Sequence, residues 1–279
     1  MLSRQRRLLF SVVTTGLAFV LTEAGLAGIG ALAERPTRSA PVGSGVHTLV
    51  CAGDSVTFGF GLPPEDAWPA QLARRPGLAA AGIRVVNAAV AGQDLRQIAM
   101  TLHPTLDFRA GPDRAVVLLG GHNDCAALGV PPPSVSSELL REGRRVLRSF
   151  TTYRLLAQVL ARARPASAAP PSGARMAACG ARLREGLEAV RAVVAASDTP
   201  LLVATYPVLD GDHRGAVSAY VNAAMLDTAV AAGVPTVDVA ACAEARPGDL
   251  QADGVHLTAA GSAALAACLE APVLRLFGR

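Results

Sequence analysis

The chain has 279 residues, of which 51% are hydrophobic and 17% charged, so it can bury a sizeable core and is neither disordered nor fibrous. Its formal net charge is +4, but it contains no lysine and its arginines are scattered among acidic residues, which argues against a nucleic-acid-binding protein. The arginine cluster in residues 141–148 is typical of a solvated helix face.

The first 35 residues have the composition of a membrane-targeting segment. Three arginines precede a nearly all-apolar run, residues 8–21, and after Thr22 and Glu23 the apolar sequence continues over residues 24–33. One interpretation is an uncleaved anchor helix from Leu8 to about Leu32, which is long enough to cross a bilayer. The other is a signal peptide cleaved after the small-residue triplet 31–33.

The length of the apolar run favours the anchor, because signal-peptide cores are usually only ~7 to 15 residues long. The arginines would then stay in the cytoplasm, and the folded domain would face outward from a single-pass membrane segment. A cleaved N-terminus would instead give a secreted or periplasmic protein. Residues 36–46, rich in Pro, Ser and Gly, are predicted to be a linker to one domain, residues 47–279.

Within that domain, short apolar runs alternate with longer stretches rich in Ala, Leu and Arg. The runs predicted as strands are Thr48–Ala52, Arg84–Asn87, Ala115–Leu119, Leu201–Thr205 and Thr236–Val239. The stretches predicted as helices are Ala67–Arg74, Asp94–Thr101, Ser137–Arg162, Ala174–Ala196, Val217–Ala232 and Thr258–Leu269. This alternation predicts an α/β fold with a parallel sheet covered on both faces. The long connection Val130–Gly173 has a Pro-rich end, and we hypothesise that it borders the pocket as a mobile lid.

Four short segments carry side chains suited to acyl chemistry: Gly53-Asp54-Ser55, Asn87–Gly92, Gly121-His122-Asn123-Asp124 and Asp253-Gly254-Val255-His256. Each follows a predicted strand or lies in a late loop. Reactive groups of open parallel sheets gather at the carboxyl ends of the strands, so these segments are expected to meet. Gly-Asp-Ser alone is a weak signal, and the four segments together are a strong one.

Ser55 is the candidate nucleophile, because a serine hydroxyl attacks only when a base removes its proton. The imidazole of His256 suits that task near neutral pH, and Asp253 can orient the ring by accepting its other N–H. Asp238, after the last predicted strand, is a rival for this carboxylate. The alternatives are a turn residue at Asp253 and a surface loop histidine at position 256.

An oxyanion hole needs donors placed where negative charge develops. The candidates are the backbone N–H of Ser55, the backbone N–H of Gly92 and the side-chain amide of Asn123. Asp54 and Asp124 are expected to brace their loops through backbone contacts. His122 is interpreted as packing in its loop, with a substrate contact as the alternative.

Together these segments resemble the SGNH (GDSL-type) hydrolase superfamily, whose blocks carry Ser, Gly, Asn and His at positions matched here by Ser55, Gly92, Asn123 and His256. The resemblance covers about Thr48 to Leu269. It implies a three-layer α/β/α sandwich with a five-stranded parallel sheet, the flavodoxin-like SGNH fold. It also implies acyl-enzyme ester hydrolysis without a cofactor. One departure is Ala89, where the second block often has another glycine.

The segment Trp68-Pro69-Ala70-Gln71-Leu72 resembles the membrane-anchored bacterial branch of this superfamily. The expected substrate is an acyl ester of a small molecule, glycan or lipid, and the expected protein is a monomer whose N-terminal segment contacts the membrane. An O-acyltransferase or deacetylase acting on cell-envelope glycans is the alternative. A nucleotide-binding module is disfavoured, because no Gly-x-Gly-x-x-Gly or Walker pattern follows the first strand.

The five cysteines are widely separated, and none has the close spacing of a zinc or redox site, so no metal is predicted. Cys51 lies in a predicted buried strand and is interpreted as a small apolar residue. The pairing of the other four depends on the fold and stays open: Cys125, Cys179, Cys242 and Cys268.

Overall fold

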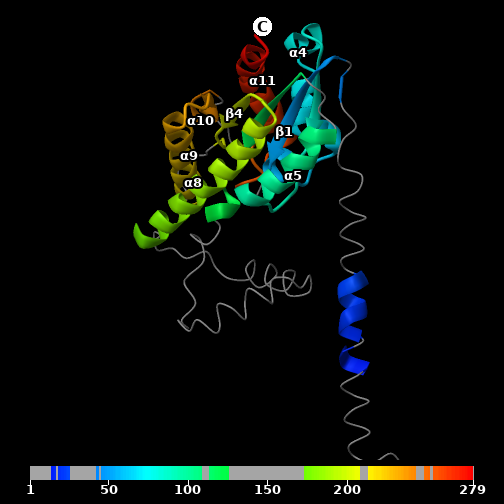
Figure 1. Ribbon diagram of the computed structural model, residues 1–279, viewed down its shortest axis with the longest axis vertical. Helices are drawn as coiled ribbons and strands as arrows, with labels where there is room; N and C mark the ends of the chain where they lie inside the picture. The colour runs from blue at the N-terminus through cyan, green and yellow to red at the C-terminus, as the bar shows by residue number, and fades with distance from the viewer. Residues whose placement is uncertain are drawn as a thin grey trace, which may run out of the picture. The chain divides into compact units, whose positions relative to one another are not determined.

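The computed structural model (Figure 1) describes residues 14–16, 18–25, 42–43, 45–108, 113–125, 173–207, 213–242, 248–251 and 254–278. The predicted helix Ser137–Arg162, the proposed lid Val130–Gly173 apart from its last residue, and Asp253 lie outside these residues. The chain divides into two compact units, Met1–Thr37 with Val130–Ser167 and Arg38–Gly129 with Ala168–Arg279. The fold and the site described below belong to the second unit.

A five-stranded parallel sheet forms the centre of this unit. Its strands are β1 (His47–Gly53), β2 (Ile83–Asn87), β3 (Arg114–Leu119), β4 (Leu201–Ala204) and β5 (Thr236–Val237), and their order is β2-β1-β3-β4-β5. Strand β1 lies between β2 and β3, and its Thr48 pairs with Arg84 on one side and Arg114 on the other. From β1 the chain goes to β2 on one side, and the later strands β3, β4 and β5 follow on the other side. In open parallel sheets, ligands bind at the carboxyl ends of the strands beside this change in the order of the strands.

The strands read as continuous apolar runs because both faces of the sheet are covered. In β3 every residue after Arg114 is buried, and in β1 every residue after His47 is buried. A half-exposed antiparallel strand would instead alternate apolar with polar residues. All five predicted strands are therefore confirmed, with ends that differ by one or two residues.

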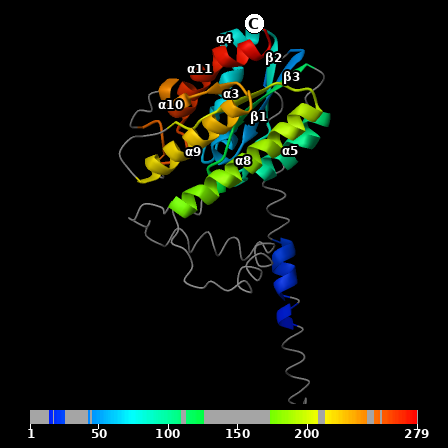
Figure 2. The same cartoon turned by 60° about the vertical axis from the view of Figure 1, so that its left-hand side comes forward.

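Helices form a layer on each face of the sheet (Figures 1 and 2). One layer contains α3 (Trp68–Ala73), α4 (Pro76–Ala80) and α11 (Ala259–Leu276), and the other contains α5 (Leu95–Phe108), α8 (Gly173–Ala196) and α9 (His213–Ala231). The short elements are α2 (Ser55–Phe58), the 3-10 turn Pro64–Asp66 and α10 (Val239–Cys242). The expected three-layer α/β/α sandwich is confirmed. Trp68 is fully buried between α3 and the sheet core.

Helix α9 begins four residues before its predicted start, and two other helices, each containing a proline, continue past their predicted ends. Helix α5 continues past Thr101 through Pro104, and α11 continues past Leu269 through Pro272. A proline in a helix interior removes one backbone hydrogen bond. Here an apolar residue beyond each proline, Leu106 in α5 and Val273 in α11, is fully buried in the core, so packing holds the helical conformation.

The last strand is shorter than predicted, because Val239 begins α10. The carboxylate of Asp238 accepts the backbone N–H of Ala240 at 3.1 Å and the hydroxyl of Thr205 at 3.1 Å. Asp238 therefore acts as a helix cap that also ties α10 to the end of β4.

Two disulfide bonds join helices to other elements. Cys125, after β3, is bonded to Cys179 of α8, and Cys242 of α10 is bonded to Cys268 of α11. Cys51 lies in β1, fully buried and without a disulfide, as the sequence predicts. The structure thus decides the pairing that the sequence left open.

In the N-terminal unit, residues 14–16 and 18–25 are helical, and Phe19, Val20 and Leu21 are exposed. Among the described residues, only Ala259–Leu276 is a helix long and apolar enough to cross a membrane. That helix is α11, and it packs Leu265 and Leu269 into the core of the sandwich. Its apolar composition is explained by this packing.

Candidate active site

The segment Gly53-Asp54-Ser55 turns sharply from β1 into α2. A Cβ atom on Gly53 would lie 2.2 Å from the carbonyl oxygen of Leu119 and 2.3 Å from the hydroxyl of Thr57, so only glycine fits. The carboxylate of Asp54 accepts the backbone N–H of Val56 at 3.1 Å and caps the helix. Ser55 is thereby held, half-buried, at the first position of α2 and at the carboxyl edge of the sheet.

His256 contacts Ser55 directly. Its Nε2 lies 2.8 Å from the Oγ of Ser55, which is hydrogen-bond distance. The imidazole also packs on the ring of Phe60, with ring centroids 4.8 Å apart. The structure therefore brings together the predicted nucleophile and the predicted base. Asp253, the predicted orienting carboxylate, lies outside the described residues.

Gln251 fastens the loop that carries His256. Its backbone N–H donates to the carbonyl of His256 at 2.7 Å, and its side-chain Nε2 donates to the carbonyls of Phe60, at 2.9 Å, and Leu257, at 2.8 Å. Phe60 belongs to the loop after Ser55. One glutamine side chain thus joins the two loops that carry the serine and the histidine.

Asn123 and Gly92 also come together at this edge. The side-chain Nδ2 of Asn123 donates to the backbone carbonyl of Gln93, the next residue after Gly92, at 2.9 Å. This bond uses one of the two amide hydrogens, and the second can donate to a substrate oxygen. Gly92 has φ of +82°, is exposed, and a Cβ there would meet nothing within 4 Å. The left-handed backbone conformation at this position favours glycine, and no heavy atom would block a side chain there.

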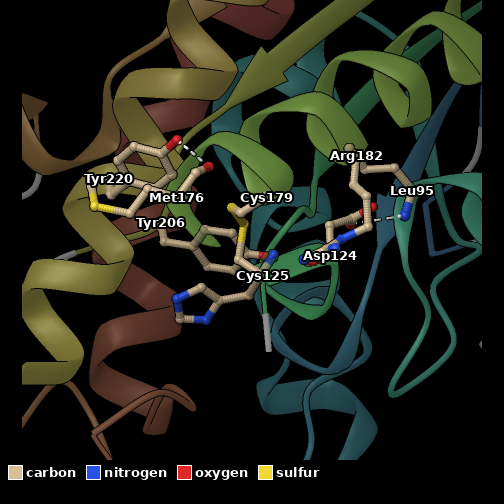
Figure 3. The surroundings of a disulfide bond; sticks show 9 residues. Leu95, Asp124, Cys125, Met176, Cys179, Arg182, Tyr206 and Tyr220 are labelled. Carbon is tan, nitrogen blue, oxygen red and sulfur yellow. Dashed lines mark hydrogen bonds between the residues drawn. A yellow bond between two sulfur atoms is a disulfide. The ribbon is translucent and has the colours of Figure 1, made fainter. Parts of the chain in front are cut away.

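Asp124 braces the turn that presents Asn123 (Figure 3). Its carboxylate accepts the backbone N–H of Leu95 at 3.1 Å, and its backbone carbonyl accepts the Nε of Arg182 in α8 at 2.7 Å. Burial raises the pKa of Asp124 to about 7. The bracing role expected for this aspartate is confirmed, and Cys125 ties the same turn to α8.

Buried ionisable groups lie behind the serine. Burial raises the pKa of Asp54 to about 6, although hydrogen bonds from Tyr206 and Val56 and the nearby His256 act to lower it. Burial, and then the nearby His256, lower the pKa of His122 to about 4. The Nε2 of His122 lies 2.8 Å from the hydroxyl of Ser218 in α9. His122 packs in its loop, as expected, and is neutral near pH 7.

The sequence did not single out two residues of this site, Tyr206 and Gln251. Tyr206 comes two residues after β4, so the rule that selected Ser55 and Asn123, a position just after a parallel strand, applies to it as well. Gln251 had no such signal, because its role depends on carbonyl groups of two distant loops.

Within the described part of the chain, no group of three or more His, Cys, Asp or Glu side chains is arranged to hold a metal ion. The arrangement instead suits nucleophilic acyl chemistry: a hydroxyl in contact with an imidazole, beside an amide donor and an open backbone turn.

A parallel α/β/α sandwich with these four segments at the carboxyl edge of its sheet has the architecture of the SGNH hydrolases. The chain belongs to the GDSL-like lipase/acylhydrolase family, whose sequence profile matches residues 51–264. No curated protein matches the chain.

Solved structures show the same fold. The lipase/acylhydrolase from Enterococcus faecalis is 19% identical with a TM-score of 0.52, and the match covers 84% of this chain and 96% of that one. The psychrotrophic esterase EstA from Pseudoalteromonas sp. is 13% identical with a TM-score of 0.54, and covers 84% and 100%. The acetylxylan esterase Axe2 from Geobacillus stearothermophilus is 19% identical with a TM-score of 0.50, and covers 86% and 97%. At these identities the likeness concerns the fold alone.

Proposed function

We propose that the protein is a serine esterase that hydrolyses carboxylic acyl or acetyl esters through an acyl-enzyme intermediate. The observation that carries this proposal is the 2.8 Å contact between the Oγ of Ser55 and the Nε2 of His256. A serine and a histidine in this contact form the activated nucleophile of acyl-transfer enzymes. Membership of the acylhydrolase family supports the same reaction class.

In the first half-reaction, the Oγ of Ser55 attacks the ester carbonyl carbon while Nε2 of His256 takes the hydroxyl proton. Negative charge moves to the carbonyl oxygen, where the proposed donors are the backbone N–H groups of Ser55 and Gly92 and the amide of Asn123. The imidazolium then gives its proton to the leaving alcohol, and the acyl group remains on Ser55. Asp253 is proposed to hold the imidazole in the tautomer that this step requires.

In the second half-reaction, water replaces the alcohol. His256 takes a proton from the water, the hydroxide attacks the acyl-enzyme, and the Ser55 oxygen leaves with the proton from the imidazolium. The products are a carboxylic acid and the regenerated serine. If a glycan hydroxyl takes the place of water, the same site catalyses O-acyl transfer, so this alternative shares every residue of the mechanism.

The test combines turnover of p-nitrophenyl esters with labelling by a fluorophosphonate probe. Ser55→Ala should abolish both labelling and turnover, and His256→Ala should lower turnover by about 10⁴-fold or more, as in other serine hydrolases whose base is removed. Two matched controls should behave like the wild type: Ser197→Ala, just before β4 at the edge of the sheet opposite to Ser55, and His103→Ala, at an exposed position of α5. Wild-type protein that neither labels nor turns over any acyl length from acetyl to dodecanoyl would reject the proposal.

The acetylated glycan is a specific substrate to include, because one protein of the same fold is an acetylxylan esterase. Release of acetate from an O-acetylated polysaccharide indicates a deacetylase. Appearance of the acetyl group on an added acceptor glycan, without a matching yield of free acetate, indicates the transferase.

We also propose that the catalytic domain faces the outside of the cytoplasm. Disulfides persist mainly in oxidising compartments, and Cys125–Cys179 and Cys242–Cys268 are both bonded. The exposed apolar side chains of Phe19, Val20 and Leu21 support a membrane contact for the N-terminal segment. N-terminal sequencing of protein from the membrane fraction distinguishes a retained anchor, which begins at residue 1, from a cleaved signal peptide.

A further inference from the structure

Tyr206 is a buried residue that the proposed reaction does not use. It lies two residues after β4, is only 3% exposed, and burial raises the pKa of its phenol well above the ordinary value. The phenol therefore stays protonated at any working pH. A buried tyrosine hydroxyl needs partners, and those of Tyr206 belong to the two segments that carry the proposed catalytic groups.

The first partner is Asp54, the residue that precedes Ser55. The Tyr206 hydroxyl donates to the Oδ2 of Asp54 over 2.5 Å, while the Oδ1 of the same carboxylate caps the backbone N–H of Val56. Asp54 is 1% exposed, so this carboxylate makes its bonds out of contact with bulk water. The phenol of Tyr206 thus holds the Asp54 carboxylate in place, and this carboxylate in turn caps the helical turn that carries Ser55.

The second partner is His122, the residue that precedes Asn123. The same phenolic oxygen accepts the backbone N–H of His122 over 3.4 Å, a long bond, and the imidazole of His122 stacks on the Tyr206 ring with centroids 4.7 Å apart. The Ser218 hydroxyl contacts the far side of that imidazole, at Nε2. One side chain therefore touches the segments of both the nucleophile and the proposed oxyanion donor.

Tyr206 is itself held by α9. Its backbone N–H donates to the Oδ1 of Asn222 at 2.9 Å, and its carbonyl accepts the Nδ2 of Asn222 at 2.8 Å. Asn222 is 6% exposed and uses both ends of its amide on this one residue. These two bonds hold the backbone of Tyr206 in place. The phenol therefore has a fixed position, to which the segments that carry Ser55 and Asn123 are bonded.

We propose that Tyr206 is a positioning residue that holds Ser55 and Asn123 in the correct positions relative to each other. Its one hydroxyl bonds to the residue before each of them. The inference rests on the proposed esterase function. Acyl transfer needs the attacking oxygen and the oxyanion donors within a fraction of an ångström of their places, and misplacement by ~1 Å can cost about 10²-fold in rate. Tyr206 touches no reacting atom and acts through Asp54 and His122.

The decisive comparison is Tyr206→Phe against Tyr220→Phe. Each removes one hydroxyl and keeps the ring, and Tyr220 in α9 bonds to the carbonyl of Met176 in α8 and to neither catalytic segment (Figure 3). For Tyr206→Phe we expect kcat to fall about 10- to 100-fold with KM unchanged, because the reacting groups are displaced while the substrate surface is kept. For Tyr220→Phe both constants should match the wild type.

The pH profile supplies a readout that a merely structural role would not move. Asp54 faces the phenol of Tyr206 and the imidazole of His256, and the hydrogen bond from Tyr206 opposes the effect of burial on its carboxylate. Without that bond Asp54 takes up a proton at higher pH, so the acidic limb of kcat should move to higher pH in Tyr206→Phe. In the Asp54→Ala background, which has no carboxylate at this position, adding Tyr206→Phe should lower kcat by a smaller factor than it does in the wild type, because only the bond to His122 is then lost.

Amide hydrogen exchange tests the same inference without any activity. Peptides covering residues 53–60 and 119–125 should exchange faster in Tyr206→Phe than in the wild type or Tyr220→Phe, while peptides of β1 stay protected. Equal kinetics, an unmoved acidic limb and equal exchange in the two tyrosine variants would overturn the inference. If wild-type protein fails to label at Ser55, the esterase proposal is rejected, and the exchange comparison still decides whether Tyr206 joins the two segments.

Discussion

The imidazole Nε2 of His256 lies 2.8 Å from the hydroxyl oxygen of Ser55, although 201 residues separate them in the chain. The contact depends on the parallel sheet, because β1 delivers Ser55 to the edge at which the loop before α11 delivers His256. It also depends on short side-chain links between loops, of which those of Gln251 and Asn123 are the clearest.

Asn123→Ala should lower kcat by about 10²- to 10³-fold with a small change in KM, as expected when one oxyanion donor is removed. Asn123→Asp keeps the size of the side chain but replaces the donor by a carboxylate, so it should be at least as damaging. Steady-state kinetics on a p-nitrophenyl ester measure both. Activity within twofold of wild type in both variants would exclude Asn123 from the oxyanion hole.

Gln251→Ala should lower kcat about tenfold, because the loop with His256 loses its bonds to the carbonyls of Phe60 and Leu257. Gln251→Glu should not restore activity, since a carboxylate cannot donate to two carbonyls. Glu188→Ala is the control, because Glu188 is an exposed residue of α8 whose carboxylate pairs with Arg191 and not with a segment of the site. The rate of fluorophosphonate labelling at Ser55 is the measurement, and equal rates for Gln251→Ala and the control would contradict this role.

The disulfide Cys125–Cys179 should matter for both stability and catalysis. Chain-entropy arguments give about 4 kcal/mol for a loop of 54 residues and about 3.5 kcal/mol for the 26 residues of Cys242–Cys268. Replacing both members of each pair by serine should therefore destabilise the protein in either case, as measured by urea unfolding. Only the first replacement should also lower kcat, because Cys125 lies two residues after Asn123. Equal kinetic effects of the two replacements would contradict this distinction.

Asp124 predicts a pH dependence of stability with a definite sign. Its pKa is raised from 3.8 in the unfolded chain to about 7 in the folded protein, so the folded state binds a proton more readily. The contribution of Asp124 to the free energy of unfolding is therefore fully present below pH 4 and is lost as the pH rises toward 7.

Asp124→Asn keeps an acceptor for the Leu95 N–H and does not titrate. As the pH rises from 4 to 7, the free energy of unfolding of the wild type should therefore fall relative to that of Asp124→Asn. Urea titrations of both proteins at half-unit pH steps measure it. A constant difference across this window would show that Asp124 does not titrate as described.

Much of the fold follows from local patterns in the sequence. The five strands were predictable because a parallel strand buried on both faces is a short, continuous apolar run, as in Ala115–Leu119. The ends of helices α5 and α11 were not, because Pro104 and Pro272 are local stop signals that core packing overrides. Asp238 shows the same limit: its position allowed a rival catalytic acid, and only the structure shows it capping α10.

By itself the sequence determined which chemical groups are candidates for the site. Ser55, Gly92, Asn123 and His256 could be named because each lies in a short segment whose residue types match one catalytic task. Only the tertiary structure decided which groups support them. The bonds of Tyr206 and Gln251 and the pairing of Cys125 with Cys179 join residues far apart in the chain. Such contacts leave no periodicity or spacing in the sequence, because they depend on how close the folded backbone brings two side chains in space.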